Sequence, residues 1–256
     1  MKITAHVPCQ QYGFFEVEGD ENDLKKIEKL YNKYAEHPLS FEEGIWKDIV
    51  TFTGETVQYN EKTHKYRSED GTILVSGSQF AKKLEKPFDA AMIAGKVGAK
   101  HGVSPEEVAS CWSDNGKLSR MFGSAVHKAM ENWFRHKGVA CDKEYNKPKH
   151  PFLNLVVDSF PLKDENILPE IMVSSVKNRM VGQIDGLVIT GEKEGYIIDY
   201  KSDNDIKKNL KKHFAQLSFY AVILQKHGWS IERVEVWNYT DKWEKYESPV
   251  LDLKTI

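Results

Sequence analysis

Two aspartates and a lysine lie within or at the end of neighbouring apolar runs. Asp199 directly follows the run YII, and Asp185 is embedded in the run QIDGLVI. Side chains alternate along a strand, so Lys201 shares a face with Asp199. The turn-like sequence GEKEG between the runs predicts an antiparallel hairpin centred near Lys193, in which Asp185 faces roughly Lys201. We therefore expect two carboxylates and one ammonium group to converge.

These residue types point to phosphodiester chemistry. Two buried carboxylates repel each other, and a cation between them relieves the repulsion. Mg²⁺ prefers carboxylates together with water and phosphate oxygens, which leaves coordination positions open for hydrolysis. Lys201 would then orient or deprotonate the attacking water, or offset charge on the phosphate. The alternative is a buried ion pair that only supports the fold.

The Asp-x-Lys triplet alone carries little information, because it recurs at residues 23–25, 205–207 and 252–254. The elements around it carry more. Their hydrophobic periodicity switches between the helical and the strand pattern, which predicts an α/β core. The expected elements are helices at 117–137 and 150–160, strands at 167–175, 179–190 and 196–202, a helix at 209–227 that Gly228 ends, and a strand at 233–240.

The first 115 residues predict two smaller units. The strand-like runs KITAHV and GFFEVEG precede a helical pattern at 20–37, which predicts a ββα appendage over residues 1–45. After a connector at 38–48, residues 56–77 are β-rich and residues 87–136 are helical, with a capping box at Ser104-Pro105-Glu106-Glu107. We therefore expect a domain over 46–256, in which a β/helical substrate-channel region at 46–115 precedes a catalytic core at 116–256.

Short motifs in this core resemble those of a known family. GQIDG at 182–186 with IDYKS at 198–202 resembles the core motif of the PD-(D/E)XK nuclease superfamily, although Ile184 stands where that motif has proline. FGSAVH at 122–127, Pro169-Glu170, and Gln216 with Tyr220 resemble the small-residue helix, the first-strand acid and the Q-x-x-x-Y helix of its RecB-like exonuclease branch. The order of elements is also that of the superfamily core.

The resemblance implies a restriction-endonuclease-like core, a mixed sheet flanked by helices in the order αβββαβ. It implies one or two Mg²⁺ or Mn²⁺ ions as cofactors and DNA as the substrate. The implied metal ligands are His127, Asp185 and Asp199, and the implied catalytic residues are Glu170, Asp185, Asp199, Lys201, Gln216 and Tyr220.

Some of these residues also have a purely structural interpretation. A histidine in an amphipathic helix, such as His127, is more often a core or surface residue than a ligand. Glu170 can be an exposed acid at a strand edge, and Tyr220 can be a core aromatic one turn from Gln216. The joint occurrence of the motifs in the family's order favours the functional interpretation.

Composition limits the partners and cofactors. The 256 residues include 36 basic and 38 acidic ones, so the formal net charge of -2 offers no overall attraction to nucleic acid, and a DNA site must be local. The three cysteines are too few and too widely spaced to predict an iron–sulfur cluster. The sequence contains no Gly-rich phosphate-binding loop, so we expect no bound nucleotide. A run of charged residues on a helix is most often just a solvent-exposed face. The residues that could instead contact DNA phosphates are Lys117, Arg120, Lys207, Lys208, Lys211 and Lys212.

These features together predict a metal-dependent DNA nuclease, chiefly an exonuclease that acts on linear or single-stranded ends in recombination, repair or degradation. The chain resembles free-standing exonucleases of phages and of mitochondrial genome maintenance, with phage or host recombination and replication proteins as expected partners. No leader sequence or apolar run of the ~18 residues that span a bilayer is seen, so we expect a cytoplasmic protein. The alternatives are a structure-specific endonuclease and a non-catalytic DNA-binding adaptor.

Overall fold

The computed structural model describes residues 3–9, 13–19, 46–85, 88–137, 151–162 and 165–254. Two compact units emerge, one formed by Met1–Ser76 with Met172–Gly182 and the other by Gly77–Ile171 with Gln183–Ile256. The expected domain boundary at residues 45 and 46 borders a segment outside the described residues and stays a prediction. Within the described part of the chain, no helix combines the length and apolar character needed to cross a membrane.

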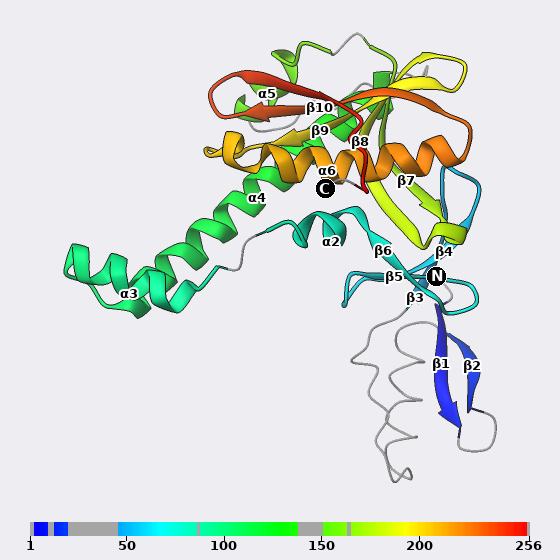
Figure 1. The fold of residues 1–256 in the computed structure, drawn as a ribbon, viewed down its shortest axis with the longest axis horizontal. Coiled ribbons are helices and arrows are strands. Elements are labelled where there is room, and N and C mark those ends of the chain that lie inside the picture. Colours follow the sequence, from blue (N-terminus) through cyan, green and yellow to red (C-terminus); the bar gives the residue numbers. More distant parts are fainter. Residues whose placement is uncertain are drawn as a thin grey trace. The chain divides into compact units, whose positions relative to one another are not determined.

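The first unit is built on antiparallel strands (Figure 1). β1 (Ile3–Cys9) pairs with β2 (Gly13–Gly19) and with β3 (Trp46–Val50). β4 (Thr56–Asn60), β5 (Lys65–Ser68) and β6 (Ile73–Ser76) follow β3 in sequence order, each paired with the strand before it. Residues 75–76 of β6 then pair in parallel with residues 180–181. Val57, Leu74 and Val181 form its buried core.

Most of this unit agrees with the sequence patterns. The predicted strand pair at KITAHV and GFFEVEG is confirmed, and so are the strands separated by turns in the β-rich stretch. The prediction of a connector through residue 48 is wrong, because pairing with β4 makes 46–50 a strand despite its weak apolar pattern. The predicted helix at 20–37 lies outside the described residues.

The second unit contains a mixed sheet, as predicted. β7 (Ile167–Ser175) pairs with β8 (Met180–Gly191), which pairs antiparallel with β9 (Glu194–Lys201). β10 (Ser230–Tyr239) lies parallel to β9, and β11 (Trp243–Pro249) is antiparallel to β10. The last residues of β7 and the first of β8 belong to the first unit. β11 was not expected, because its polar sequence WEKYESP carries no strand-like apolar run.

Five helices are described in the second unit: α2 (Gly77–Lys82), α3 (Ala90–His101), α4 (Pro105–Lys137), α5 (Pro151–Asp158) and α6 (Ile206–Lys226). The capping box is confirmed, because Glu107 N donates to Ser104 Oγ at 3.1 Å and Ser104 N donates to the Glu107 carboxylate at 2.7 Å. The helix expected to start at residue 117 therefore starts at Pro105 and continues through the turn-forming sequence DNG at 114–116.

The two faces of β9 meet different helices. Ile198 and Tyr200 belong to a buried cluster with residues of α4 and α5, in which Phe160 makes edge-to-face ring contacts with Tyr200 and Trp237. No residue of α6 belongs to that cluster, and α6 packs instead against β10 and β9 (Figure 1). Because side chains alternate along a strand, Asp199 and Lys201 project towards the face that α6 covers.

Candidate metal centre

The β8–β9 hairpin brings the two aspartates together. Gly186 pairs with Ile198, and the same register continued by one residue sets Asp185 opposite Asp199. The predicted pairing of Asp185 with Lys201 is therefore wrong. The turn occupies only residues 192–193, and a register shift between Ile189 and Gly191 moves the hairpin axis. Asp185 is fixed by a hydrogen bond of 3.0 Å from the Tyr200 amide to its Oδ2.

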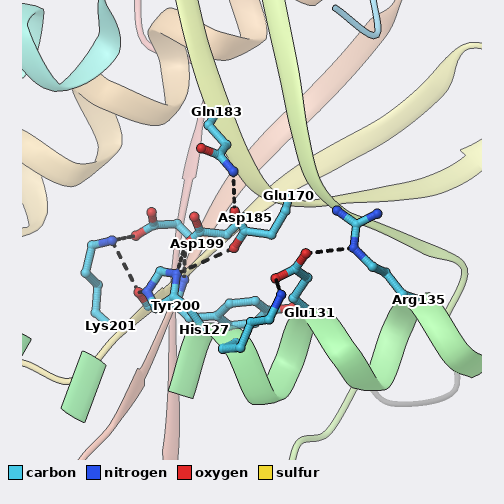
Figure 2. A network of polar contacts seen from close by, with 10 residues as sticks. His127, Glu131, Arg135, Glu170, Gln183, Asp185, Asp199, Tyr200 and Lys201 are labelled. Carbon is cyan, nitrogen blue, oxygen red and sulfur yellow. Dashed lines mark hydrogen bonds and ion pairs between the residues drawn. The ribbon is translucent and has the colours of Figure 1, made fainter. Parts of the chain in front are cut away.

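Lys201 forms an ion pair with Asp199, as strand alternation predicts. Its Nζ lies 2.6 Å from Asp199 Oδ2 and donates to the Tyr200 carbonyl at 3.2 Å (Figure 2). Only 6% of the Asp199 side chain and 23% of the Lys201 side chain are exposed. Burial lowers the pKa of Lys201, but Asp199 and Asp185 outweigh burial and raise it, so the ammonium stays charged.

His127 reaches the same site from α4. Its Nε2 lies 2.8 Å from the Tyr200 carbonyl oxygen, and its Nδ1 lies 3.4 Å from Asp185 Oδ2. A carbonyl oxygen can only accept, so Nε2 carries a hydrogen, and the ring presents an Nδ1 lone pair to the carboxylate side once Nδ1 gives up its proton. A backbone hydrogen bond of this kind orients ligating histidines in metal sites.

Glu170 completes the group from β7. Its Oε1 lies 3.8 Å from His127 Nδ1, while Gln183 Nε2 donates to its Oε2 at 2.6 Å (Figure 2). Glu170 has a φ of 51°, a left-handed conformation that costs on the order of 1–3 kcal/mol for a residue other than glycine and that often occurs at functional sites. Gln183 is a residue that the sequence reasoning missed, although its place two residues before Asp185 sets both on one face of β8.

The electrostatics of the group favour a cation. Burial and the Asp199 charge raise the pKa of Asp185 to about 7. Burial lowers the pKa of His127, but Asp185 and Glu170 outweigh it and raise the pKa to about 9. Burial also raises the pKa of Asp199, but Lys201 more than offsets it, so that pKa is lowered. The Asp185 carboxyl therefore holds a proton more tightly than an ordinary aspartate does, and a metal ion can replace that proton.

The donor atoms fit a divalent ion. One donor atom each from His127, Glu170 and Asp185 lies within 4.8 Å of the others. One nitrogen with carboxylate oxygens suits Mn²⁺ as well as Mg²⁺. Asp199, an expected ligand, is not in this group, and its Oδ2 pairs with Lys201 instead. Glu170, expected as a catalytic residue and not as a metal ligand, is in it.

Gln216 and Tyr220 lie on α6. Gln216 Nε2 donates to the Tyr220 hydroxyl at 2.9 Å, and a Cβ added to Gly77 would lie 2.2 Å from Tyr220 Cε1, so glycine is required where α2 begins. Their bond links two turns of one helix and puts neither residue among the candidate ligands.

His213 is a second residue that the sequence reasoning missed. Only 7% of it is exposed, and neither ring nitrogen has a hydrogen-bond partner among the described residues. Leaving a buried donor or acceptor unpaired costs about 1–3 kcal/mol. Its spacing three residues before Gln216 on α6 was the available sign.

The candidate DNA contacts differ in their partners. Lys117, Lys208 and Lys212 form ion pairs with Asp114, Asp205 and Glu85, respectively. Three others, Arg120, Lys207 and Lys211, are exposed and have no ion pair within the described residues.

Residues 160–245 match the family model of the PD-(D/E)XK nuclease superfamily. The match includes the acids of the site, Lys201, and both Gln216 and Tyr220, but His127 lies outside it. The mixed sheet with helices on its faces agrees with the restriction-endonuclease-like fold that the sequence motifs implied. No curated protein matches the chain.

Proposed function

Because the chain contains a nuclease domain of the PD-(D/E)XK superfamily, we propose that it is a Mg²⁺- or Mn²⁺-dependent exonuclease that shortens linear DNA. The observation that carries the proposal is the convergence of His127, Glu170 and Asp185 beside the Asp199–Lys201 ion pair. These groups come from α4, β7, β8 and β9, and their charged ends meet in one place.

The ligands and the lysine have separate tasks. His127 Nδ1, Glu170 and Asp185 would hold the ion, and Asp199 would join them when Lys201 releases its Oδ2. The bound ion supplies a polarised phosphate oxygen and a more acidic water. Lys201 positions the water that attacks phosphorus and offsets the negative charge that grows on the phosphate as the bond to the leaving oxygen breaks.

Arg120 supports a substrate with a phosphate backbone. It lies seven residues before His127, which is two turns and about 10 Å along the axis of α4 on the same face. A Cβ added to Gly123, between them, would lie 3.6 Å from Ser202 Oγ, so this face of α4 runs close to the end of β9. An exposed guanidinium at this spacing suits a neighbouring phosphate and reads no base.

The RecB-like branch is part of the proposal. His127 in a small-residue helix and the bonded pair of Gln216 and Tyr220 support it. That branch implies action on free ends in recombination, repair or degradation of DNA, in a cytoplasmic setting that includes phage-infected cells, with recombination or replication proteins as partners.

A comparison of two forms of one DNA tests the proposal. Linear DNA and the covalently closed circle of the same sequence are incubated with Mg²⁺ or Mn²⁺ at equal salt. We expect the linear form, with a single-stranded end, to shorten progressively and the circle to survive. Asp185→Asn is the control for contaminating nucleases. Efficient cutting of the circle would favour the structure-specific endonuclease, and no cleavage of either form would favour the non-catalytic adaptor.

A further inference from the structure

His213 is a buried histidine to which the proposed reaction gives no task. It lies in the first half of α6, and both of its ring nitrogens lack a hydrogen-bond partner within the described part of the chain. Buried polar side chains nearly always have a partner, and an exception calls for a physical reason. An imidazole held in this way is available to a group that reaches it in another state of the site.

His213 lies on the helix that covers the face of β9 to which Asp199 and Lys201 project. α6 covers the face of β9 opposite the Tyr200 cluster, and these two side chains project to that face. The helix begins five residues after Lys201, so its first half lies near the end of β9. The electrostatic interactions of His213 with Asp199 and Lys201, and also with Lys212 and Asp203, agree with a place near the end of β9.

Burial favours the neutral form of His213. Burial lowers its pKa and Lys201 lowers it further, while the opposing effect of Asp199 is smaller than that of burial. A neutral imidazole has one nitrogen that donates and one that accepts. The ring therefore offers an acceptor to a cationic neighbour.

Lys201 is the group that needs such an acceptor. In this structure its ammonium lies 2.6 Å from Asp199 Oδ2 and donates to the Tyr200 carbonyl at 3.2 Å. If Asp199 Oδ2 binds a divalent ion, that oxygen can no longer hold the Lys201 ammonium in the same ion pair. A buried ammonium that loses its carboxylate requires another hydrogen-bond partner.

We propose that His213 is a positioning residue for Lys201. When Asp199 binds the metal ion, the imidazole of His213 accepts a hydrogen bond from the Lys201 ammonium. This inference rests on the proposed function and adds to it a residue that no motif assigned. His213 contacts neither the substrate nor the ion, and it acts by holding Lys201 where the attacking water is positioned.

Substitution of the imidazole gives the first test. His213→Leu has a similar volume without polar atoms, so kcat should fall about tenfold or more while KM for DNA stays unchanged. His213→Gln, whose amide oxygen accepts a hydrogen bond, should restore part of the rate. In the Lys201→Ala background, His213→Leu should add no further loss. Wild-type kcat in His213→Leu, or fully additive losses, would overturn the role.

Thermal unfolding with and without Mn²⁺ gives a readout that does not need cleavage. We expect the Mn²⁺-induced rise in Tm to be smaller in His213→Leu than in the wild type, and equal in Lys201→Ala and the double variant. The matched control is Ser218→Ala, which removes another buried polar group of α6, the acceptor of the Leu251 amide at 2.9 Å. This control should shift Tm equally with and without Mn²⁺.

The outcomes separate the two proposals. A protein whose Tm rises with Mn²⁺ but which cleaves no DNA contradicts the proposed function, and the Tm comparison still decides the role of His213. An equal Mn²⁺ response in the wild type and His213→Leu overturns the role of His213 alone. A wild-type Tm that Mn²⁺ does not change overturns both.

Discussion

The same Asp-x-Lys triplet occurs twice within nine residues, at the end of β9 and at the start of α6, and it has different properties in the two places. On the strand, Asp199 and Lys201 share a face and form a buried ion pair at 2.6 Å. On the helix, Asp205 precedes the first turn and pairs with Lys208 at 2.9 Å, with both side chains mostly exposed. The period of the element decides which charges meet, and burial decides whether their meeting has chemical consequences.

The largest expected effect distinguishes Asp199 of the strand triplet from Asp205 of the helix triplet. Asp199→Ala should abolish metal-dependent cleavage, because it removes a ligand and the partner of Lys201. Asp205→Ala is the matched control: it removes an exposed ion pair worth at most about 1 kcal/mol, so cleavage should persist. Gel assays of both variants, with folding checked by circular dichroism, make the measurement. Turnover at the wild-type rate in Asp199→Ala would remove Asp199 from the site.

The next effect concerns the lysine of the strand triplet. Lys201→Ala should lower kcat by about 10²–10³, because a preorganised charge at the phosphate is lost, while Mn²⁺ binding measured by calorimetry is kept. If Mn²⁺ affinity collapsed in the folded variant, Lys201 would be shaping the metal site instead of serving the water.

A smaller effect tests α4, the helix that carries His127. His127→Ala should weaken Mn²⁺ binding by about 10-fold or more, and Mg²⁺ binding less, because nitrogen ligands suit Mn²⁺ better. His101→Ala, an exposed histidine at the end of α3, is the control. Equal losses for the two ions, or none, would make His127 a structural histidine.

The smallest effect belongs to the lysine of the helix triplet. Lys207→Ala should leave kcat unchanged, weaken DNA binding modestly and reduce the slope of log affinity against log salt by about one, as expected for one lost phosphate contact. Binding titrations at several salt concentrations measure the slope. An unchanged slope would show that Lys207 is only solvated.

Local patterns were sufficient for much of the second unit. The apolar run that predicts a strand at 167–175 gives the bounds of β7 without change, and the capping box gives the start of α4. Both succeed because the interactions involved lie within one element. β3 and β11 were missed because only pairing with their neighbours makes these segments strands.

By itself, the sequence determined which residues can do the chemistry and which elements carry them: two aspartates and a lysine on a predicted hairpin, a histidine on a helix and a glutamate on the first strand. The tertiary structure alone decided how these residues meet. The register shift set Asp185 opposite Asp199 rather than Lys201, and the packing of α4 and β7 brought His127 and Glu170 to one ion-sized space.

The physical reason is range. Periodicity and capping depend on residues within a few positions of each other. The orientation of His127, in contrast, is set by its hydrogen bond to the Tyr200 carbonyl, 73 positions away. Likewise, the lack of a hydrogen-bond partner for His213 among the described residues depends on what α6 packs against and on no local pattern. Contacts between distant elements form only when a whole face is buried, and burial is set by the assembled core.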